Sequence, residues 1–172
     1  MRLFIAVQFT EEIKDGLCAV IEALKANAGG GNFTARQNLH LTLAFLGEVK
    51  QEKVPSIQRI MDSIPVQPFL LQLGNTGTFR RSGGDIYWIG VKPEPALLQM
   101  QSFLTRELRK NGYPIEQRAY RPHVTLGREV IAGCPVDTGT MQMQVNAASL
   151  MKSERIKGKL TYTELYRSSL SI

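Results

Sequence analysis

Apolar positions along the chain follow two spacings, and these spacings predict an ordered series of strands and helices. Residues 2–9 (RLFIAVQF) form a nearly continuous apolar run, which is typical of a strand buried on at least one face. Apolar residues then recur at helical spacing as far as about Ala26. Thr10 is a candidate N-cap for this helix, because Glu11 and Glu12 follow it in the first turn, where the helix dipole favours acids.

Two further amphipathic helices are predicted downstream. Residues 51–64 repeat their apolar positions at helical spacing, and Pro55 is tolerated in the first turn of such a helix. Residues 95–110 form the third helix, which Asn111 and Gly112 terminate. Glycine-rich loops or connections are expected at residues 29–32 and 74–85. The remaining strands are expected at 39–46, 69–73, 86–91, 123–126, 141–147, 149–156 and 159–165.

One segment of the chain repeats. HLTLAFLGEV begins at His40 and HVTLGREV begins at His123, about half the chain further on. Mixed strands and helices with one internal repeat predict an α+β fold of two lobes, related by an approximate two-fold axis. We expect residues 1–172 to form one bilobal domain, because this length is typical of a single domain.

Composition narrows the class of protein. Hydrophobic residues make up 43% and charged residues 21%, as in ordinary globular proteins. No apolar run is as long as a membrane span and the N-terminus lacks the pattern of a secretory signal, so we expect a cytoplasmic protein without a membrane partner. Cys18 and Cys134 are expected to be reduced packing residues. Neither histidine has another ligand at a usual metal-binding spacing, so no metal is expected.

The net charge of +6 suits an anionic partner such as a phosphate or an RNA end, and equally a solvated basic surface. Two local concentrations of basic residues favour a partner. Arg80 and Arg81 precede a serine-glycine turn, and the C-terminal region carries Lys152, Arg155, Lys157 and Lys159.

The two histidines are the only ones in the chain, and each begins the pattern His-x-Thr-Leu. Side chains alternate between the faces of a strand, so His40 and Thr42 point one way, as do His123 and Thr125. If the lobes face each other, two imidazoles and two hydroxyls converge on one cleft. A single half-buried histidine is usually a structural residue, but two copies that use every histidine favour an active site. Both threonines also fit simply as strand-forming residues.

This set of groups suits hydrolysis of a phosphodiester. One imidazole accepts the proton of an attacking water, and the other donates a proton to the leaving oxygen. The hydroxyls of Thr42 and Thr125 can donate to the non-bridging phosphoryl oxygens. The near-identical motifs do not assign the two proton-transfer roles.

Residues near the motifs are further candidates for substrate contacts. Arg128 faces away from the cleft in a regular strand, but a bulge or the strand end would free it to reach a phosphate. Arg36 and Arg118, four and five residues before the histidines, fit either a phosphate site or the surface. The candidate stacking residues are Phe45, Tyr120 and Trp88, although aromatic residues at such positions more often belong to the core or are partly buried.

NLHLTLAFLGEV and RPHVTLGR closely resemble the paired motifs of the two-histidine phosphoesterases, and within them the bacterial and archaeal RNA 2′,3′-cyclic phosphodiesterases, the LigT-like proteins. The resemblance extends over most of the chain, including RLFIAVQF, IYWIGV and the C-terminal SLMKSERIKGKLTYTELYRSSL. It implies a bilobal α+β fold in which two antiparallel sheets face each other across a central cleft, with the helices outside.

The resemblance also implies an activity. It implies hydrolysis of a terminal 2′,3′-cyclic phosphate on RNA to a 2′-phosphomonoester, with His40 as proton donor and His123 as proton acceptor. We expect no cofactor, a monomer, and RNA with cyclic phosphate ends or small cyclic nucleotides as partners. The alternatives are 2′-5′ ligation of RNA halves, cleavage of 2′-5′ oligonucleotides, and an RNA-end-binding module without catalysis.

Overall fold

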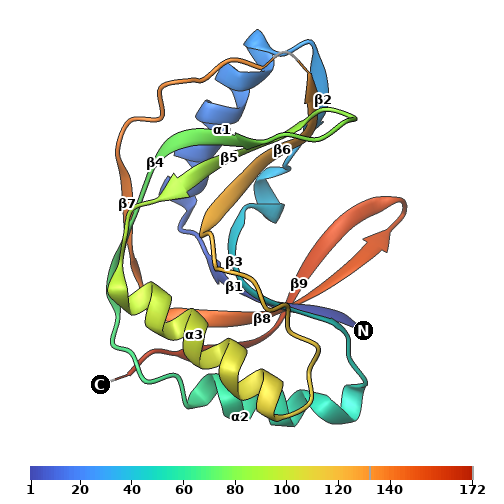
Figure 1. Ribbon diagram of the computed structural model, residues 1–172, viewed down its shortest axis with the longest axis vertical. Coiled ribbons are helices and arrows are strands. Elements are labelled where there is room, and N and C mark those ends of the chain that lie inside the picture. The colour runs from blue at the N-terminus through green and yellow to red at the C-terminus, as the bar shows by residue number, and fades with distance from the viewer. Residues whose placement is uncertain (132, 172) are drawn as a thin grey trace.

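The structure is a computed structural model that describes residues 1–131 and 133–171, and these residues form two antiparallel sheets (Figure 1). Sheet A has the strand order β3-β1-β8-β9, and sheet B has the order β2-β6-β5-β4-β7. The strands of sheet A are β3 (His40–Glu48), β1 (Arg2–Gln8), β8 (Ala147–Ile156) and β9 (Lys159–Ser169). The strands of sheet B are β2 (Gly30–Phe33), β6 (His123–Ile131), β5 (Asp85–Val91), β4 (Phe69–Phe79) and β7 (Met141–Val145).

Helices cover the outer faces of both sheets (Figure 1). Helix α1 (Glu11–Asn27) packs against strands of sheet B, whereas α2 (Val54–Asp62) and α3 (Pro95–Lys110) pack on sheet A and on each other. Short 3₁₀ turns, η1 (Arg36–Asn38) and η2 (Gln51–Lys53), precede β3 and α2. The predicted α+β fold, with two antiparallel sheets and external helices, is confirmed.

Local signals account for the helix boundaries. The hydroxyl of Thr10 accepts a hydrogen bond from the amide of Ile13 at 3.3 Å, which caps α1 at the predicted residue. Helix α3 ends before Gly112, which has φ of 84°, as the predicted stop signal requires.

The two faces of β1 are buried in different apolar clusters. Leu3, Ile5 and Val7 are buried in the main core. Phe4 and Ala6 point to the opposite face, where a smaller apolar cluster also contains Met151 and, partly buried, Tyr162. Sheet A is therefore apolar on both faces, and the second face forms the floor beside the histidine of β3.

Two of the predicted glycine-rich segments and one cysteine differ from expectation. Residues 29–32 are not only a loop, because most of this segment belongs to β2 and pairs with β6. Strand β4 continues through the first half of residues 74–85, because its pairing with β5 extends to Phe79. Glycine signals local flexibility, but a neighbouring strand that supplies hydrogen bonds overrides it. Both cysteines are free, and Cys18 is partly buried. Cys134 is exposed, so the prediction that it is a packing residue is wrong.

Within the described residues, no helix is long and apolar enough to cross a bilayer.

Candidate active site

His40 begins β3 and is held by two hydrogen bonds. Its Nδ1 lies 2.7 Å from the main-chain carbonyl of Asn38, and its Nε2 lies 2.9 Å from the hydroxyl of Thr42. A carbonyl oxygen only accepts, so Nδ1 carries the proton, and in the neutral ring Nε2 accepts from the Thr42 hydroxyl. His40 and Thr42 therefore share a face of the strand, while Leu41 and Leu43 are buried, as the alternation predicts.

His123 begins β6 in the same way. Its Nδ1 lies 2.6 Å from the carbonyl of Arg121, so this ring also carries its proton on Nδ1. Among the residues that the structure describes, its Nε2 has no hydrogen-bond partner. Each ring is thus oriented by the carbonyl two residues earlier, with Nε2 left for chemistry. In their hydrogen bonds the two histidines differ in that Thr42 occupies Nε2 of His40.

Aromatic rings support each imidazole. The ring of His40 lies 4.9 Å from that of Phe4 and 5.2 Å from that of Tyr162. The ring of His123 lies 5.2 Å from that of Phe79 and 6.3 Å from that of Trp88. These contacts restrict each ring to one orientation, which is the preorganisation that proton transfer needs.

The aromatic support of His123 depends on a glycine. The Trp88 indole lies over Gly77 on the neighbouring strand β4, where an added Cβ would lie 2.3 Å from the indole ring. A larger residue at position 77 would displace Trp88 and with it one wall around His123.

Burial lowers the pKa of His40, and the charge of His123 lowers it further, while the hydrogen bond to the Asn38 carbonyl opposes both. The field of one imidazole therefore reaches the other. Strands β3 and β6 are also in direct contact, although they belong to different sheets. The structure thus brings together the two motifs that lie about half the chain apart.

Each motif strand contains a bulge at the same place. In β3 the pairing with β1 skips Leu43, and in β6 the pairing with β5 skips Leu126; each leucine lies three residues after its histidine. A bulge reverses the alternation beyond it. Phe45 and Arg128, each five residues after its histidine, consequently turn to the side of the histidines instead of away from it.

The position of Arg128 is the one expected for a bulged strand. A second irregularity follows at Glu129, which has φ of 53° and packs against Gly84. The charge of Arg128, together with that of Arg2, acts on the hydroxyl of Tyr162 across the cleft, although burial is the larger influence and raises the pKa of Tyr162.

Two hydroxyls tie each motif to the segment that leads into the other. The Tyr120 hydroxyl, three residues before His123, donates to the carbonyl of Thr42 at 2.7 Å. The Thr34 hydroxyl, six residues before His40, donates to the carbonyl of Thr125 at 2.9 Å. Burial raises the pKa of Tyr120, so its hydroxyl remains a donor. We call this pair of bonds the reciprocal hydroxyl contacts. They fix the position of the two motif strands relative to each other.

We expect Tyr120→Phe to lower the free energy of unfolding by about 1 kcal/mol, because it leaves the Thr42 carbonyl without its donor. We expect it also to lower kcat by about tenfold with little change in KM, because the two imidazoles lose their alignment. Steady-state kinetics and thermal unfolding measure the two effects.

Tyr113→Phe is the matched control, since the hydroxyl of Tyr113 also donates to a main-chain carbonyl, that of Lys53, at 3.2 Å. Equal kcat values in the two variants would show that the Tyr120 hydroxyl contributes to stability only.

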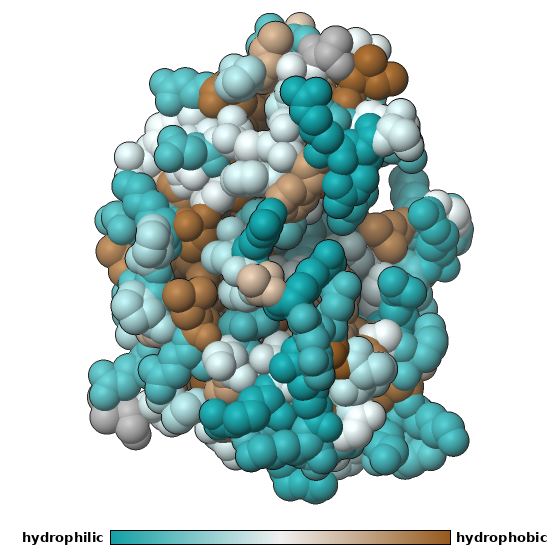
Figure 2. Space-filling model, viewed as in Figure 1, coloured by the Kyte–Doolittle hydropathy of each residue, from teal (hydrophilic) through white to brown (hydrophobic). Residues whose placement is uncertain are grey.

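A cavity of about 510 Å³ is lined by Phe4 and Tyr162, the two rings that contact His40. Residues of β1, β3, β8 and β9 line it from sheet A, and Arg128 of β6 lines it from sheet B. Phe45 projects into it with 62% of its surface exposed. The space-filling view shows a hollow between the sheets beside the β8–β9 hairpin, with strongly hydrophilic side chains along its rim (Figure 2).

Three of the sequence-based candidates have other contacts. Arg36 forms salt bridges with Glu11 at 2.6 Å and Asp15 at 2.5 Å, which fasten η1 to α1. Arg118 pairs with Glu116 at 2.9 Å and is 76% exposed. Tyr120 contacts Thr42 through its hydroxyl, as described above. The sequence did not predict that Phe4 and Tyr162 contact the ring of His40, or that Thr34 binds the carbonyl of Thr125. These contacts arise only from the pairing of strands that are distant in sequence.

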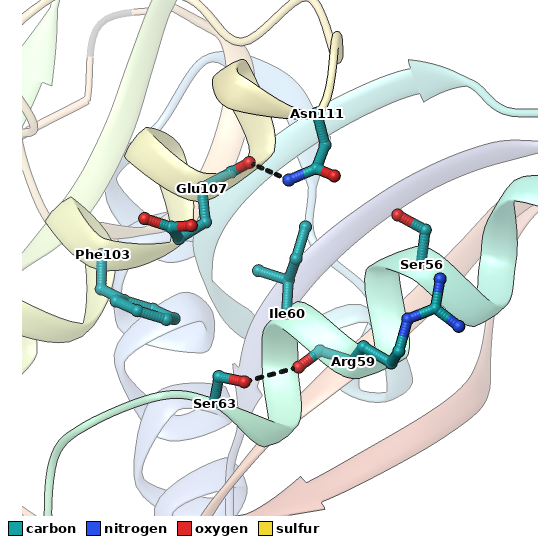
Figure 3. A pocket seen from close by; sticks show the side chains of 7 residues that line it. All are labelled: Ser56, Arg59, Ile60, Ser63, Phe103, Glu107 and Asn111. Atoms are coloured by element: carbon teal, nitrogen blue, oxygen red, sulfur yellow. Dashed lines mark hydrogen bonds between the residues drawn. The ribbon is translucent and has the colours of Figure 1, made fainter.

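A second, shallower pocket of about 230 Å³ lies between α2 and α3 on the outer face (Figure 3). Arg59, Phe103 and Glu107 line it. Neither cavity is lined by a histidine, but Phe4 and Tyr162 of the larger one contact the ring of His40. Within residues 1–131 and 133–171, no group of three His, Cys, Asp or Glu side chains is arranged to hold a metal ion. The paired histidines beside the larger cavity therefore form the stronger candidate site.

Comparison with known proteins agrees with this geometry. A profile of the 2'-5' RNA ligase superfamily matches residues 13–135. The chain is 33% identical to the RNA 2',3'-cyclic phosphodiesterase of Archaeoglobus fulgidus over 74% of this chain and 72% of that protein. It is 31% identical to the Escherichia coli enzyme of the same name over 99% of this chain and 97% of that protein.

A solved structure shares the whole fold. The crystal structure of E. coli LigT complexed with 3'-AMP superimposes with a TM-score of 0.85 at 30% identity, covering 99% of this chain and 98% of that chain. The sequence match covers most of the chain, and the structural match covers nearly all of it. The chain belongs to the 2'-5' RNA ligase superfamily.

Proposed function

We propose that this protein hydrolyses 2′,3′-cyclic phosphate ends of RNA to 2′-phosphomonoesters, using His40 and His123 as an acid/base pair. One observation carries the proposal: both imidazoles have Nδ1 fixed by a main-chain carbonyl, which leaves both Nε2 atoms to exchange protons at one phosphorus. Relatives named RNA 2',3'-cyclic phosphodiesterase support the substrate class.

The reaction is an in-line displacement. A water oxygen attacks phosphorus as its proton passes to Nε2 of His123, which has no partner among the described residues and so presents its lone pair. The bond between phosphorus and O3′ breaks, and O3′ takes the proton on Nε2 of His40. The products are a 2′-phosphate and a 3′-hydroxyl. The strain of the five-membered ring favours the forward direction.

The hydroxyls of Thr42 and Thr125 complete the site. Each lies two residues after its histidine on the same strand face, from which it can donate to a non-bridging phosphoryl oxygen. When phosphate binds, the Thr42 hydroxyl turns from Nε2 of His40 to the substrate, and this frees Nε2 to carry the proton for O3′. Arg128, which the bulge turns to the cleft, adds positive charge beside the same phosphate.

The pKa of His40 gives a directional prediction. As the proton donor, His40 must be protonated, and its pKa in the free enzyme lies below the ordinary value of 6.5 because of burial. The basic limb of the kcat/KM profile should therefore fall at a pH below 6.5. An anionic phosphate at Nε2 favours the charged imidazole, so the basic limb of the kcat profile should lie at higher pH.

Initial rates across pH, fitted separately for kcat and kcat/KM, measure both limbs. A basic limb at the same pH in both profiles, or one that survives in His40→Asn, would assign the proton donor to another group.

One experiment tests the proposed function. The purified protein is incubated, with and without a chelator, with an oligonucleotide that ends in a 2′,3′-cyclic phosphate, and the position of phosphate in the product is determined. We expect a 2′-phosphate at the same rate in both samples. Tight binding of the cyclic end without turnover would instead indicate an RNA-end-binding module, and loss of activity with chelator would indicate a metal requirement.

The superfamily description favours one second activity, 2′-5′ ligation. It needs the same proton transfers, with the 5′-hydroxyl of another RNA in place of water. Adding a 5′-hydroxyl oligonucleotide to the same assay detects it as a longer product.

A further inference from the structure

The walls beside His123 are more aromatic than the binding of a water molecule requires. The ring of His123 lies 5.2 Å from that of Phe79 and 6.3 Å from that of Trp88, and these two rings lie 5.4 Å from each other. Phe79 and Trp88 come from neighbouring strands of sheet B, β4 and β5, and both are only partly buried. In the proposed reaction the attacking oxygen gives its proton to Nε2 of His123. A ligand on these rings would therefore lie on the nucleophile's side of phosphorus.

We propose that Phe79, Trp88 and the arginines of the β4–β5 turn bind the 5′-terminal nucleotide of a second RNA, whose 5′-hydroxyl takes the place of water. The inference rests on the proposed function and assigns a binding site to the acceptor strand of 2′-5′ ligation. O5′ bonds to phosphorus as its proton passes to Nε2 of His123. The bond between phosphorus and O3′ breaks, and O3′ takes the proton on Nε2 of His40. The product is a 2′-5′ phosphodiester with a free 3′-hydroxyl.

Trp88 is held with one side of its indole against the sheet. An added Cβ at Gly77 would lie 2.3 Å from the indole, so the ring can lie this close to β4 only because position 77 has no side chain. An added Cβ at Gly90 would lie 3.4 Å from the same ring. The ring is on the face of sheet B that carries His123, so its other side is turned to the cleft. Every base has a face that can stack on such a ring.

The indole N–H indicates that Trp88 is not placed for the fold alone. Its Nε1 is buried and has no hydrogen-bond partner among the described residues. Buried polar groups are nearly always paired, and an unpaired one lowers stability. The polar end of this side chain therefore does not stabilise the fold, whereas its broad ring offers the cleft a surface for stacking.

Arg80 and Arg81 supply positive charge next to these rings. Both are exposed, and neither forms a salt bridge with a carboxylate of the described residues. The guanidinium of Arg81 lies 5.9 Å from the centre of the Phe79 ring and donates to the carbonyl of Arg80 at 2.8 Å. The second RNA continues through O3′ of its first nucleotide. Guanidinium groups bind the phosphodiester at that oxygen with paired hydrogen bonds.

The turn that carries the two arginines is fixed. The amide of Gly84 donates to the carbonyl of Arg81 at 3.2 Å, and the amide of Arg81 donates to the carboxylate of Asp85 at 3.3 Å. Gly84 has φ of 116° and packs so closely on Glu129 that an added Cβ would lie 2.6 Å from its main chain. A turn that is already ordered binds a ligand with a smaller loss of entropy than a mobile loop.

The two basic concentrations of the chain lie on two hairpins, one from each sheet. The β4–β5 hairpin carries Arg80 and Arg81, and the β8–β9 hairpin carries Lys152, Arg155, Lys157 and Lys159. Both hairpins project to the same side of the molecule (Figure 1). Each sheet thus contributes one histidine and one basic hairpin, an arrangement that suits two RNA ends, one on each side of the phosphorus.

Trp88 is the only tryptophan of the chain, so its fluorescence reports directly on this site. The probe is a dinucleotide with a 5′-hydroxyl and a 3′-hydroxyl, which has no cyclic phosphate and cannot react alone. We expect it to quench the fluorescence of the wild type saturably. Arg80→Ala and Arg81→Ala should each raise its Kd by about tenfold, and reduce the slope of the log of the association constant against log[salt] by about 0.7. Arg81→Lys, which keeps the charge, should lose less.

A second measurement separates the acceptor strand from the cyclic end. With an oligonucleotide that ends in a 2′,3′-cyclic phosphate and the dinucleotide as acceptor, Arg81→Ala should lower the rate of ligation by about tenfold and leave the rate of hydrolysis unchanged, because water needs no such site. Arg59→Ala is the matched control, because Arg59 is an exposed arginine on α2 in the outer pocket (Figure 3). It should leave the Kd and both rates unchanged.

The outcomes distinguish this inference from the proposed function. Quenching that does not saturate, a Kd unchanged in both alanine variants, or saturable quenching without any ligated product would overturn the acceptor site and leave the proposed function standing. Equal losses of ligation and hydrolysis in Arg81→Ala would also overturn it, because the arginine would then act on the cyclic end. A wild type that hydrolyses no cyclic end would overturn both.

Discussion

Replacing either histidine by alanine is expected to lower kcat on a 2′,3′-cyclic oligonucleotide by about 10²–10⁴-fold, since each imidazole transfers one proton in the proposed displacement. The double variant His40→Ala/His123→Ala should lose much less than the product of the two single losses, because the pair acts as one unit. Single-turnover rates measure the chemical step directly.

The asparagine variants separate chemistry from folding. His40→Asn and His123→Asn keep a side-chain N–H that can donate to the carbonyls of Asn38 and Arg121, but they have no group that exchanges protons near neutral pH. They should unfold at temperatures close to that of the wild type and still be inactive. Wild-type kcat in a folded variant would remove that histidine from the mechanism.

The second large effect is expected at the two threonines. Thr42→Val and Thr125→Val should each lower kcat by about 10²–10³-fold, because the hydroxyl proposed to donate to the developing charge on the phosphoryl group is lost. Valine has nearly the same shape and favours strands, so the backbone of β3 and β6 should be unchanged.

Two comparisons isolate the hydroxyl. Thr42→Ser and Thr125→Ser keep the donor and should retain most of the activity. Thr163→Val, at an exposed position of β9 that pairs with Lys152, should have no effect on kcat. If the valine variants were as active as Thr163→Val, Thr42 and Thr125 would be strand-forming residues only.

The two motifs lie in different sheets, so the site depends on the contacts between those sheets. The reciprocal hydroxyl contacts and the contact between β3 and β6 join two sheets that share no strand. An error in the register of either strand would turn its imidazole to the wrong face, because side chains alternate. The geometry of the site thus depends on strand pairing as much as on the histidines themselves.

The helices could be predicted from local patterns in the sequence, namely the capping residues and the spacing of apolar positions. The caps and periodicity of α1 and α3 are properties of neighbouring residues, and their bounds were predicted to within a residue or two. Strand β2 and the long end of β4 could not be predicted, because their glycines indicate turns locally, and only β6 and β5 supply the hydrogen bonds that make them strands.

By itself, the sequence determined that each histidine shares a strand face with a threonine, because alternation is a property of the strand alone. Only the tertiary structure decided where the two faces meet and which other residues join them. Phe45 and Arg128 reach the cleft because pairing with β1 and β5 skips one leucine in each motif strand. A bulge arises between strands distant in sequence, and no local pattern along β3 or β6 determines it.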